Sequence, residues 1–173
     1  MARLFFALWP DAGSQAALAD WAREIANRGG GRPVSAARLH ITLVFLGEVD
    51  PARIAALCAA AEGVRSGAFT LGLDRIGAFR KTGVAWAGCR QPPAELLSLQ
   101  AGLERRIAAA GFSPDIRPFA PHLTLARRVR DPAGPADVEA VSWRVKAFAL
   151  VESARGGGGY RTLAEWPLEE GKT

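Results

Sequence analysis

Two segments of the chain, 82 residues apart, carry the same short pattern inside apolar, strand-like runs. Residues 39–47 read LHITLVFLG and residues 121–127 read PHLTLAR, so each segment contains a His-x-Thr-Leu element. The chain has only two histidines, and both occupy this pattern. The offset is close to half of the 173 residues, which predicts a fold of two similar units that each contribute one such strand.

The first of these segments predicts a strand with one polar face. Successive side chains of a strand point to opposite faces, so residues two apart share a face. We therefore expect His40, Thr42 and Val44 on one face and Phe45 on the opposite, packed face. The imidazole and the hydroxyl would then lie about 6 to 7 Å apart along the strand, a spacing that suits a phosphate group.

The second segment repeats this arrangement with different neighbours. His122 and Thr124 share a face, and the alternating leucines point the other way. Arg127 follows Thr124 by three residues, so a regular strand would place its side chain on the opposite face. Threonine occurs only six times in the chain, which makes two chance copies of the pattern improbable.

The first half of the chain alternates strands and helices around the first motif. Residues 3–9 predict a strand, followed by a helix with apolar positions at 17, 18, 21 and 25 that ends at the glycines 29–31. After the motif strand, Asp50 and Pro51 predict the start of a second helix.

The second half of the chain predicts mainly strands. Residues 69–76 and 83–89 read as strands, and a helix carrying Leu96, Leu99, Leu103 and Ile107 follows and stops at Gly111. Residues 131–137 predict a loop. Residues 142–153 and 160–168 predict a closing hairpin around four glycines, so the fold class is α+β with mainly antiparallel sheet.

Length and hydropathy predict a single domain over residues 1–173. Apolar residues make up 49% of the sequence, which is sufficient for a substantial core. No run of eighteen apolar residues is present, and the N-terminal segment lacks the features of a secretory signal. We expect a cytoplasmic protein with no membrane partner.

The cysteine and charge content argue against a metal and in favour of an anionic partner. Cys58 and Cys89 stand apart with no CxxC spacing, so we expect two small buried residues and neither disulfides nor a thiolate zinc site. A catalytic zinc ion needs three protein ligands, and neither motif has further ligands at a suitable spacing. We expect no metal and no cofactor. The net charge of +5 comes mainly from arginine and favours phosphate.

Two imidazoles and two hydroxyls of this kind suit proton transfer around a phosphate. An imidazole with a pKa near 6.5 acts as an acid or as a base at neutral pH, and hydroxyls can hold the non-bridging oxygens. Other interpretations remain open at this point. The histidines could be structural residues, or the protein could be a non-catalytic RNA- or nucleotide-binding module.

The residues also resemble a known family. The segments HITLVFLGEV and PHLTLARRV, with RLFFAL near the start and GGGGYRTLAEWPL near the end, are similar to the signature regions of the two-histidine phosphoesterase superfamily. The resemblance is to its RNA 2′,3′-cyclic phosphodiesterase branch, historically called 2′-5′ RNA ligase. It implies a bilobal fold with pseudo-twofold symmetry, in which mainly antiparallel sheets surround a central cleft and helices lie outside.

The resemblance also implies an activity and a set of site residues. The expected reaction is hydrolysis of a terminal 2′,3′-cyclic phosphate on RNA to a 2′-phosphomonoester. ATP-independent 2′-5′ ligation would use the same geometry with an RNA 5′-hydroxyl in place of water. By motif match, His40 is the proton donor, His122 is the proton acceptor, and Thr42 and Thr124 bind the phosphate. Arg127 is a further candidate phosphate-binding residue, from its place beside the second motif. Small cyclic nucleotides or 2′-5′ oligonucleotides are alternative substrates. We expect the protein to act as a monomer on RNA 3′ ends.

Overall fold

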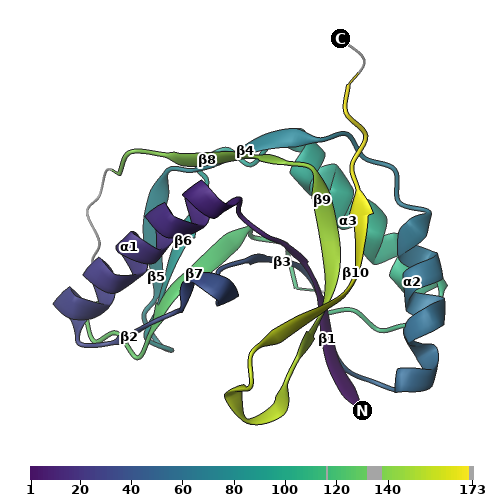
Figure 1. Cartoon of the computed structure of the whole chain (residues 1–173), viewed down its shortest axis with the longest axis horizontal. Coiled ribbons are helices and arrows are strands. Elements are labelled where there is room, and N and C mark those ends of the chain that lie inside the picture. The colour runs from purple at the N-terminus through teal and green to yellow at the C-terminus, as the bar shows by residue number, and fades with distance from the viewer. Residues whose placement is uncertain (116, 132–137, 172–173) are drawn as a thin grey trace.

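The two strands that carry the His-x-Thr pattern are neighbours in the middle of the main sheet. The computed structural model describes residues 1–115, 117–131 and 138–171 (Figure 1). The main sheet has the strand order β10-β9-β1-β3-β7-β6-β5, and β2 also pairs with β7. Its strands are β1 (Ala2–Leu8), β2 (Arg32–Pro33), β3 (Ile41–Val49), β5 (Arg75–Phe79), β6 (Val84–Gly88), β7 (His122–Arg127), β9 (Ala147–Ser153) and β10 (Tyr160–Pro167).

The helix α1 (Ala12–Gly29) packs against β2 and β7 on one side of the molecule (Figure 1). The Asp11 side chain accepts a hydrogen bond from the backbone N–H of Ser14 at 2.8 Å, which caps the first turn. Gly30 ends the helix with a φ of 71°, a left-handed conformation that glycine adopts without strain. The predicted helix and its glycine stop are confirmed.

The helices α2 (Ile54–Glu62) and α3 (Ala94–Ala109) pack together on the other side, and α3 lies against β3 (Figure 1). A short 3-10 turn, Pro51–Arg53, precedes α2, and the Asp50 carboxylate accepts from the N–H of Ala52. Leu96, Leu99, Leu103 and Ile107 of α3 are all fully buried, as their spacing predicts.

Two segments that the sequence predicts as single strands are each divided between two sheets. Residues 69–76 contain β4 (Phe69–Leu73) and the start of β5, and residues 142–153 contain most of β8 (Val141–Val145) and all of β9. The strands β4 and β8 pair with each other in a separate two-stranded sheet. The single-strand predictions were wrong because the chain changes strand partners at Asp74 and Lys146, and these partners lie far away along the sequence. Apolar alternation continues across Lys146, although it ends at Leu73 in the first segment.

The closing hairpin is confirmed, since β9 and β10 pair antiparallel around a turn that includes the 3-10 segment Arg155–Gly157. The loop predicted for 131–137 falls, from residue 132 onwards, outside the described residues. Each strand pairing in the two described sheets is antiparallel, which confirms the α+β class. The bilobal, pseudo-twofold arrangement stays a prediction.

Apolar side chains pack on both faces of β1. Leu4, Phe6 and Leu8 belong to the large core beneath the helices, and Phe5 and Ala7 belong to a small cluster on the opposite face. The small cluster also contains Ala149 and Val151 and packs against Trp9, Phe45 and Tyr160. The main sheet therefore has a small apolar cluster, around β1 and β9, on the face that does not carry the helices.

The cysteines and the helices also bear on what the sequence predicts. Cys58 and Cys89 are free thiols that are only partly buried against the large core, so the expectation of two buried residues holds only in part. Burial raises the pKa of both thiols. None of the described helices is both long and apolar enough to cross a membrane.

Candidate active site

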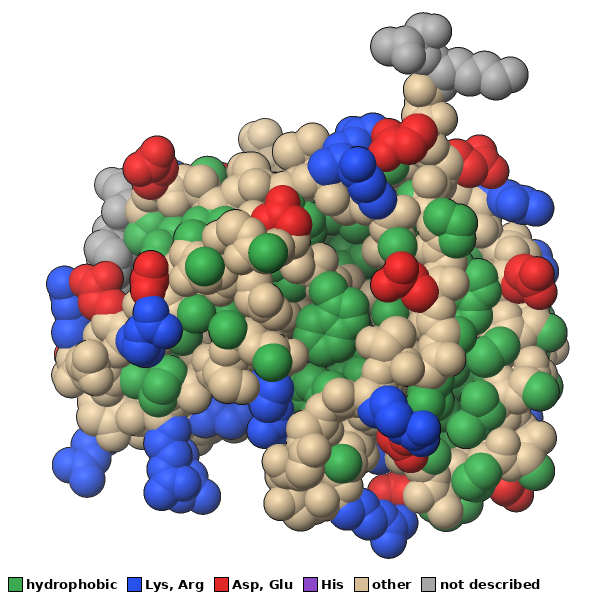
Figure 2. All heavy atoms as spheres, in the orientation of Figure 1, with side chains coloured by type: hydrophobic (Ala, Val, Ile, Leu, Met, Phe, Trp, Pro, Cys, Tyr) green, Lys and Arg blue, Asp and Glu red, His purple; other side chains and the backbone are tan. Residues whose placement is uncertain are grey.

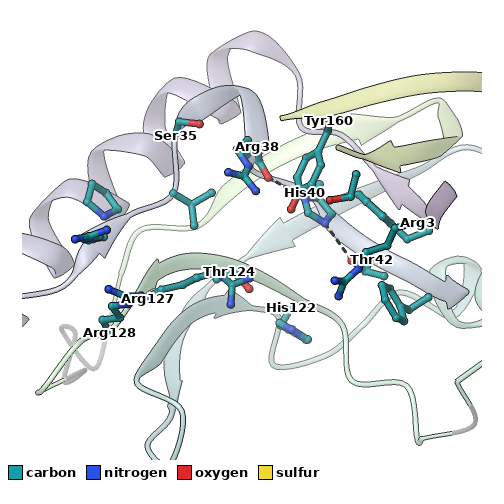
Figure 3. Close-up of a pocket in the computed structure, with 16 residues that line it drawn as sticks. Arg3, Ser35, Arg38, His40, Thr42, His122, Thr124, Arg127, Arg128 and Tyr160 are labelled. Carbon is teal, nitrogen blue, oxygen red and sulfur yellow. Dashed lines mark hydrogen bonds between the residues drawn. The ribbon is translucent and has the colours of Figure 1, made fainter. Parts of the chain in front are cut away.

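The two motifs meet where β3 and β7 pair. These strands are antiparallel, and Ile41 pairs with Leu123. Continuing this register by one residue in each direction puts His40 across from Thr124 and Thr42 across from His122. The four side chains line one cavity of about 820 Å³ (Figure 3). The motif residues that are 82 positions apart in sequence are thus brought together at one site.

A bulge in β3 changes which side chains face the cavity. Against β1, Ala7 pairs with Thr42 and Phe6 pairs with Val44, so Leu43 is an extra residue. Leu43 and Val44 are therefore both buried in the large core, and Phe45 lines the cavity. The expected placement of Val44 beside His40 and of Phe45 on the packed face was wrong for this reason.

A second bulge in β7 has the same effect. Against β6, Trp86 pairs with Thr124 and Ala85 pairs with Ala126, so Leu125 is the extra residue. Arg127 consequently lines the cavity with Thr124 instead of lying on the opposite face. The expectation that Arg127 lies on the face opposite Thr124 was wrong. Because of the bulge, the Arg127 side chain can reach a phosphate held between the two motifs.

Backbone hydrogen bonds orient both imidazoles in the same way. The Nδ1 atom of His40 lies 2.7 Å from the carbonyl oxygen of Arg38, and that of His122 lies 2.9 Å from the carbonyl oxygen of Ala120. A carbonyl only accepts, so each Nδ1 carries a hydrogen and each neutral ring keeps its lone pair on Nε2. The Nε2 atom of His40 is 3.1 Å from the Thr42 hydroxyl (Figure 3).

His40 is packed among aromatic rings. Its ring centroid lies 4.9 Å from that of Phe5, 5.5 Å from that of Trp9 and 5.2 Å from that of Tyr160. We call these three residues the aromatic cage. Burial lowers the pKa of His40 below its usual 6.5, the hydrogen bond to Arg38 opposes this, and the charges of His122, Arg127 and Arg38 lower it further.

His122 has a more open environment on the other side of the site. The ring of Phe79 meets it edge-on, with centroids 5.3 Å apart, and Phe79 is itself 44% exposed. The ring centroid of Trp86 lies 5.8 Å from that of Phe79. His122 therefore contacts one aromatic ring, which is partly exposed, whereas His40 contacts three aromatic rings.

Arginine dominates the rest of the cavity. Five arginines and no Asp or Glu are among the sixteen residues that line it. The arginines are Arg3, Arg32, Arg38, Arg127 and Arg128. Arg3 stacks over Phe45 and Arg38 stacks over Tyr160, at 5.3 and 4.7 Å from the ring centroids. A cavity with this lining attracts a strongly anionic ligand.

Sequence reasoning identified only one of these five arginines. The high arginine content did not indicate which arginines line the cavity, because arginines occur throughout the chain. Within the described residues, no group of three or more His, Cys, Asp or Glu side chains could hold a metal ion.

Comparisons with known proteins give consistent results. A family model for the 2′-5′ RNA ligase superfamily matches residues 10–157. The RNA 2′,3′-cyclic phosphodiesterase of Escherichia coli K12 is 37% identical over 171 residues, which cover 97% of each chain. The crystal structure of E. coli LigT complexed with 3′-AMP superimposes with a TM-score of 0.87 at 37% identity, covering 96% of this chain and 98% of that one. The crystal structure of TT0787 from Thermus thermophilus covers 97% of this chain and 98% of its own, with a TM-score of 0.79 at 29% identity.

Proposed function

This chain belongs to the 2′-5′ RNA ligase superfamily, and from that membership we propose that it hydrolyses the 2′,3′-cyclic phosphate at RNA 3′ ends. The product is a 2′-phosphomonoester, and the reaction needs no metal or cofactor. The curated relative that matches over nearly the whole chain is named for this activity. The same geometry, with an RNA 5′-hydroxyl in place of water, would carry out ATP-independent 2′-5′ ligation.

One observation supports this proposal above all others. Both histidines and both motif threonines line a single cavity whose described lining also contains five arginines and no carboxylate. Two imidazoles can supply a general base and a general acid, and the surrounding cations can stabilise the charge that develops on the phosphate. The related E. coli LigT has been crystallised with 3′-AMP and with phosphate, both of which are phosphate ligands.

We assign the steps to residues as follows. His122 takes a proton from the attacking water through Nε2 as the new P–O bond forms. His40 gives its Nε2 proton to the 3′-oxygen as the P–O3′ bond breaks, which leaves the phosphate on the 2′-oxygen. The base and the acid stand on opposite sides of phosphorus, as in-line displacement requires.

Thr42, Thr124 and Arg127 hold the non-bridging oxygens in this proposal. The hydroxyl of Thr42 already lies within hydrogen-bonding distance of His40 Nε2, so it can orient the proton donor as well as contact the phosphate. The assignment of Arg127 is supported by its place in the lining of the same cavity as both histidines, and by its charge, which lowers the pKa of His40.

The lowered pKa of His40 has to be reconciled with its role as donor. In the free protein, burial and the charges of Arg127 and Arg38 favour the neutral ring of His40. An anion within a few ångströms favours the charged form of an imidazole. We propose that binding of the substrate phosphate raises the pKa of His40 and so protonates the donor when the substrate is present. We further propose that the single domain acts as a cytoplasmic monomer with two lobes.

Hydrolysis of a short oligonucleotide that ends in a 2′,3′-cyclic phosphate tests this function. Phosphorus NMR of the product, compared with authentic 2′- and 3′-phosphate standards, should show only the 2′-phosphate. A dominant 3′-phosphate would reverse the donor and acceptor roles. Binding of the oligonucleotide without turnover would make the protein a binding module. Turnover of only small cyclic nucleotides or 2′-5′ oligonucleotides would assign the alternative substrates.

A further inference from the structure

Two arginines face each other at one end of the cavity. Arg32 of β2 and Arg127 of β7 are direct partners in an antiparallel pair, and both line the cavity. Side chains in such a pair have Cβ atoms about 4.5 to 5.5 Å apart, and like charges placed opposite each other are destabilising. The β2 segment is held in place, since the N–H of the following Val34 donates to the carbonyl of Leu125 at 2.8 Å.

Arg128 adds a third guanidinium from a strained backbone position. It has a φ of 57° and is the only non-glycine residue in the described chain with a positive φ. Residues other than glycine, asparagine and aspartate rarely adopt this conformation. The turn is fixed on its far side, because the N–H of Val129 donates to the carbonyl of Gly83 at 2.9 Å and the Val129 side chain is buried.

This turn brings the Arg128 side chain to the cavity. Arg127 and Arg128 both line it, although residues adjacent in a regular strand would point to opposite faces. Glycine would satisfy the backbone conformation without strain, so the backbone alone does not account for arginine at this position. Figure 3 shows both side chains on one side of the two histidines, with Arg3 on the other side.

The three charges are not neutralised by the described part of the chain. None of the three guanidiniums forms an ion pair with a described Asp or Glu, and no described acidic residue lines the cavity. Figure 2 shows basic side chains projecting from the edge of the molecule near α1 and β2. An anion bound between the three arginines would relieve their mutual repulsion.

The position of this cluster separates it from the reacting phosphate. Arg32 pairs with Arg127 at the end of β7, whereas the Ile41–Leu123 pair beside the two histidines lies at its start, and Arg128 is one residue beyond Arg127. Arg127 is the last residue of β7 and Arg128 follows it, so they come three and four residues after Thr124, on the order of 10 Å at a strand's rise. A phosphate on the far side of the terminal ribose fits this separation.

We propose that Arg32, Arg127 and Arg128 form a second phosphate subsite, which binds the phosphate attached to the 5′-oxygen of the terminal nucleotide. This inference rests on the proposed function. It specifies the substrate class as cyclic-phosphate ends that carry a 5′ phosphate or phosphodiester, in preference to nucleoside cyclic phosphates that lack one. Arg127 lies between the two subsites and contacts both phosphates.

Two matched substrates test the subsite. Adenosine 2′,3′-cyclic phosphate is compared with the same compound carrying a 5′-phosphate, and the dinucleotide ApA with a 2′,3′-cyclic end serves as the phosphodiester version. We expect kcat/KM to be at least about tenfold higher for the 5′-phosphorylated compound, because a hydrogen bond to a charged group contributes at least that much. A ratio near one for the wild-type protein would overturn the subsite.

Variants then assign the preference to the cluster. Arg128→Gly keeps the left-handed backbone and removes the guanidinium. Arg32→Gln removes the charge of a second arginine, which lies on a different strand. Each should reduce the ratio of the two kcat/KM values severalfold or more. Arg130→Ala is the control, since Arg130 is exposed, carries the same charge and does not line the cavity. Its ratio should equal that of the wild type.

The outcomes separate the two proposals. If Arg128→Gly and Arg32→Gln slow both substrates equally, or if Arg130→Ala lowers the ratio as much, the subsite is wrong and the cluster acts only as a general positive field. If the wild type turns over neither substrate, or if His122→Ala turns over both normally, the proposed function is wrong. Thermal unfolding checks the fold, and Arg128→Gly should unfold at or above the wild-type temperature because it relieves the backbone strain.

Discussion

The two His-x-Thr strands share a pattern and a bulge, but they hold their imidazoles in different surroundings. His40 lies in the aromatic cage, its Nε2 atom contacts Thr42, and its pKa is lowered by burial. His122 has the equivalent backbone hydrogen bond to Ala120 but only Phe79 against its ring. The difference arises outside the motifs, because the cage comes from β1, the segment after it and β10.

This comparison shows how one repeated motif can supply two chemical roles. A donor and an acceptor at the same pH need environments that favour different protonation states. The motif itself fixes the tautomer of each ring through the carbonyl of the residue two positions earlier. The surrounding rings and charges favour the neutral form of His40 in the free protein, so the proposed donor role depends on the bound phosphate as well as on the motif.

The largest expected effect is the loss of either imidazole. His40→Ala and His122→Ala should each lower kcat on a cyclic-phosphate-terminated oligonucleotide at least about a hundredfold, the usual contribution of one acid or base. The two should differ in stability. His40→Ala leaves a space among the cage rings and should cost on the order of 1 kcal/mol in the free energy of unfolding, whereas His122→Ala should cost less.

Rates and thermal melts of the two alanine variants, with His→Asn at the same positions as conservative controls, measure both effects. Near-normal turnover by either folded variant would refute the two-histidine mechanism. Equal stability losses would show that the aromatic cage contributes no packing that His122 lacks.

The threonines should give smaller and unequal effects. Thr42→Val and Thr124→Val keep the side-chain shape and remove one hydroxyl each. We expect Thr42→Val to cost about tenfold in kcat/KM, since its hydroxyl also contacts His40, and Thr124→Val to cost less, because other donors can still hold the phosphate. Steady-state kinetics on the same oligonucleotide measure both values, and a larger loss at Thr124 would contradict the asymmetry.

The pH dependence should show the difference between the two imidazoles directly. A donor must carry its proton, so kcat/KM should fall as the pH rises through the pKa of His40 in the free protein, which lies below 6.5. The corresponding limb of kcat, which reports the complex, should lie at higher pH because the bound phosphate favours the charged ring. Tyr160→Leu replaces one ring of the cage and should move the kcat/KM limb to higher pH.

NMR titration of the two histidines checks the same point without substrate. His40 should titrate below 6.5 in the free protein and at higher pH when inorganic phosphate is bound. A free-protein pKa at or above the usual value, or no response to phosphate, would remove the proposed coupling between binding and protonation.

The smallest expected effect is that of chelation. Neither half of the site has a ligand set for a catalytic metal among the described residues, so exhaustive treatment with EDTA should leave kcat unchanged for the wild type. A catalytically active zinc site in another enzyme, treated in parallel, is the positive control. Loss of activity that one divalent cation restores would show that the two-histidine mechanism is incomplete.

Local pattern was sufficient to predict most elements and the four motif residues. Helix spacing and the glycines 29–31 predicted α1 because amphipathic periodicity and helix stop signals are local properties. The sequence did not reveal where β4 gives way to β5 or β8 to β9, since pairing partners lie far away along the chain. The bulges at Leu43 and Leu125 were also invisible, because an extra residue becomes evident only against the register of a neighbouring strand.

The sequence by itself therefore determined the chemistry that is available: two histidines, each followed by a threonine on the same face of a strand. The tertiary structure decided how that chemistry is assembled. It placed the motifs across from each other at Ile41 and Leu123, turned Arg127 towards the cavity, and enclosed only His40 in aromatic rings. The physical reason is that alternation and capping act between near neighbours, whereas register, burial and electrostatic coupling depend on residues that folding brings together.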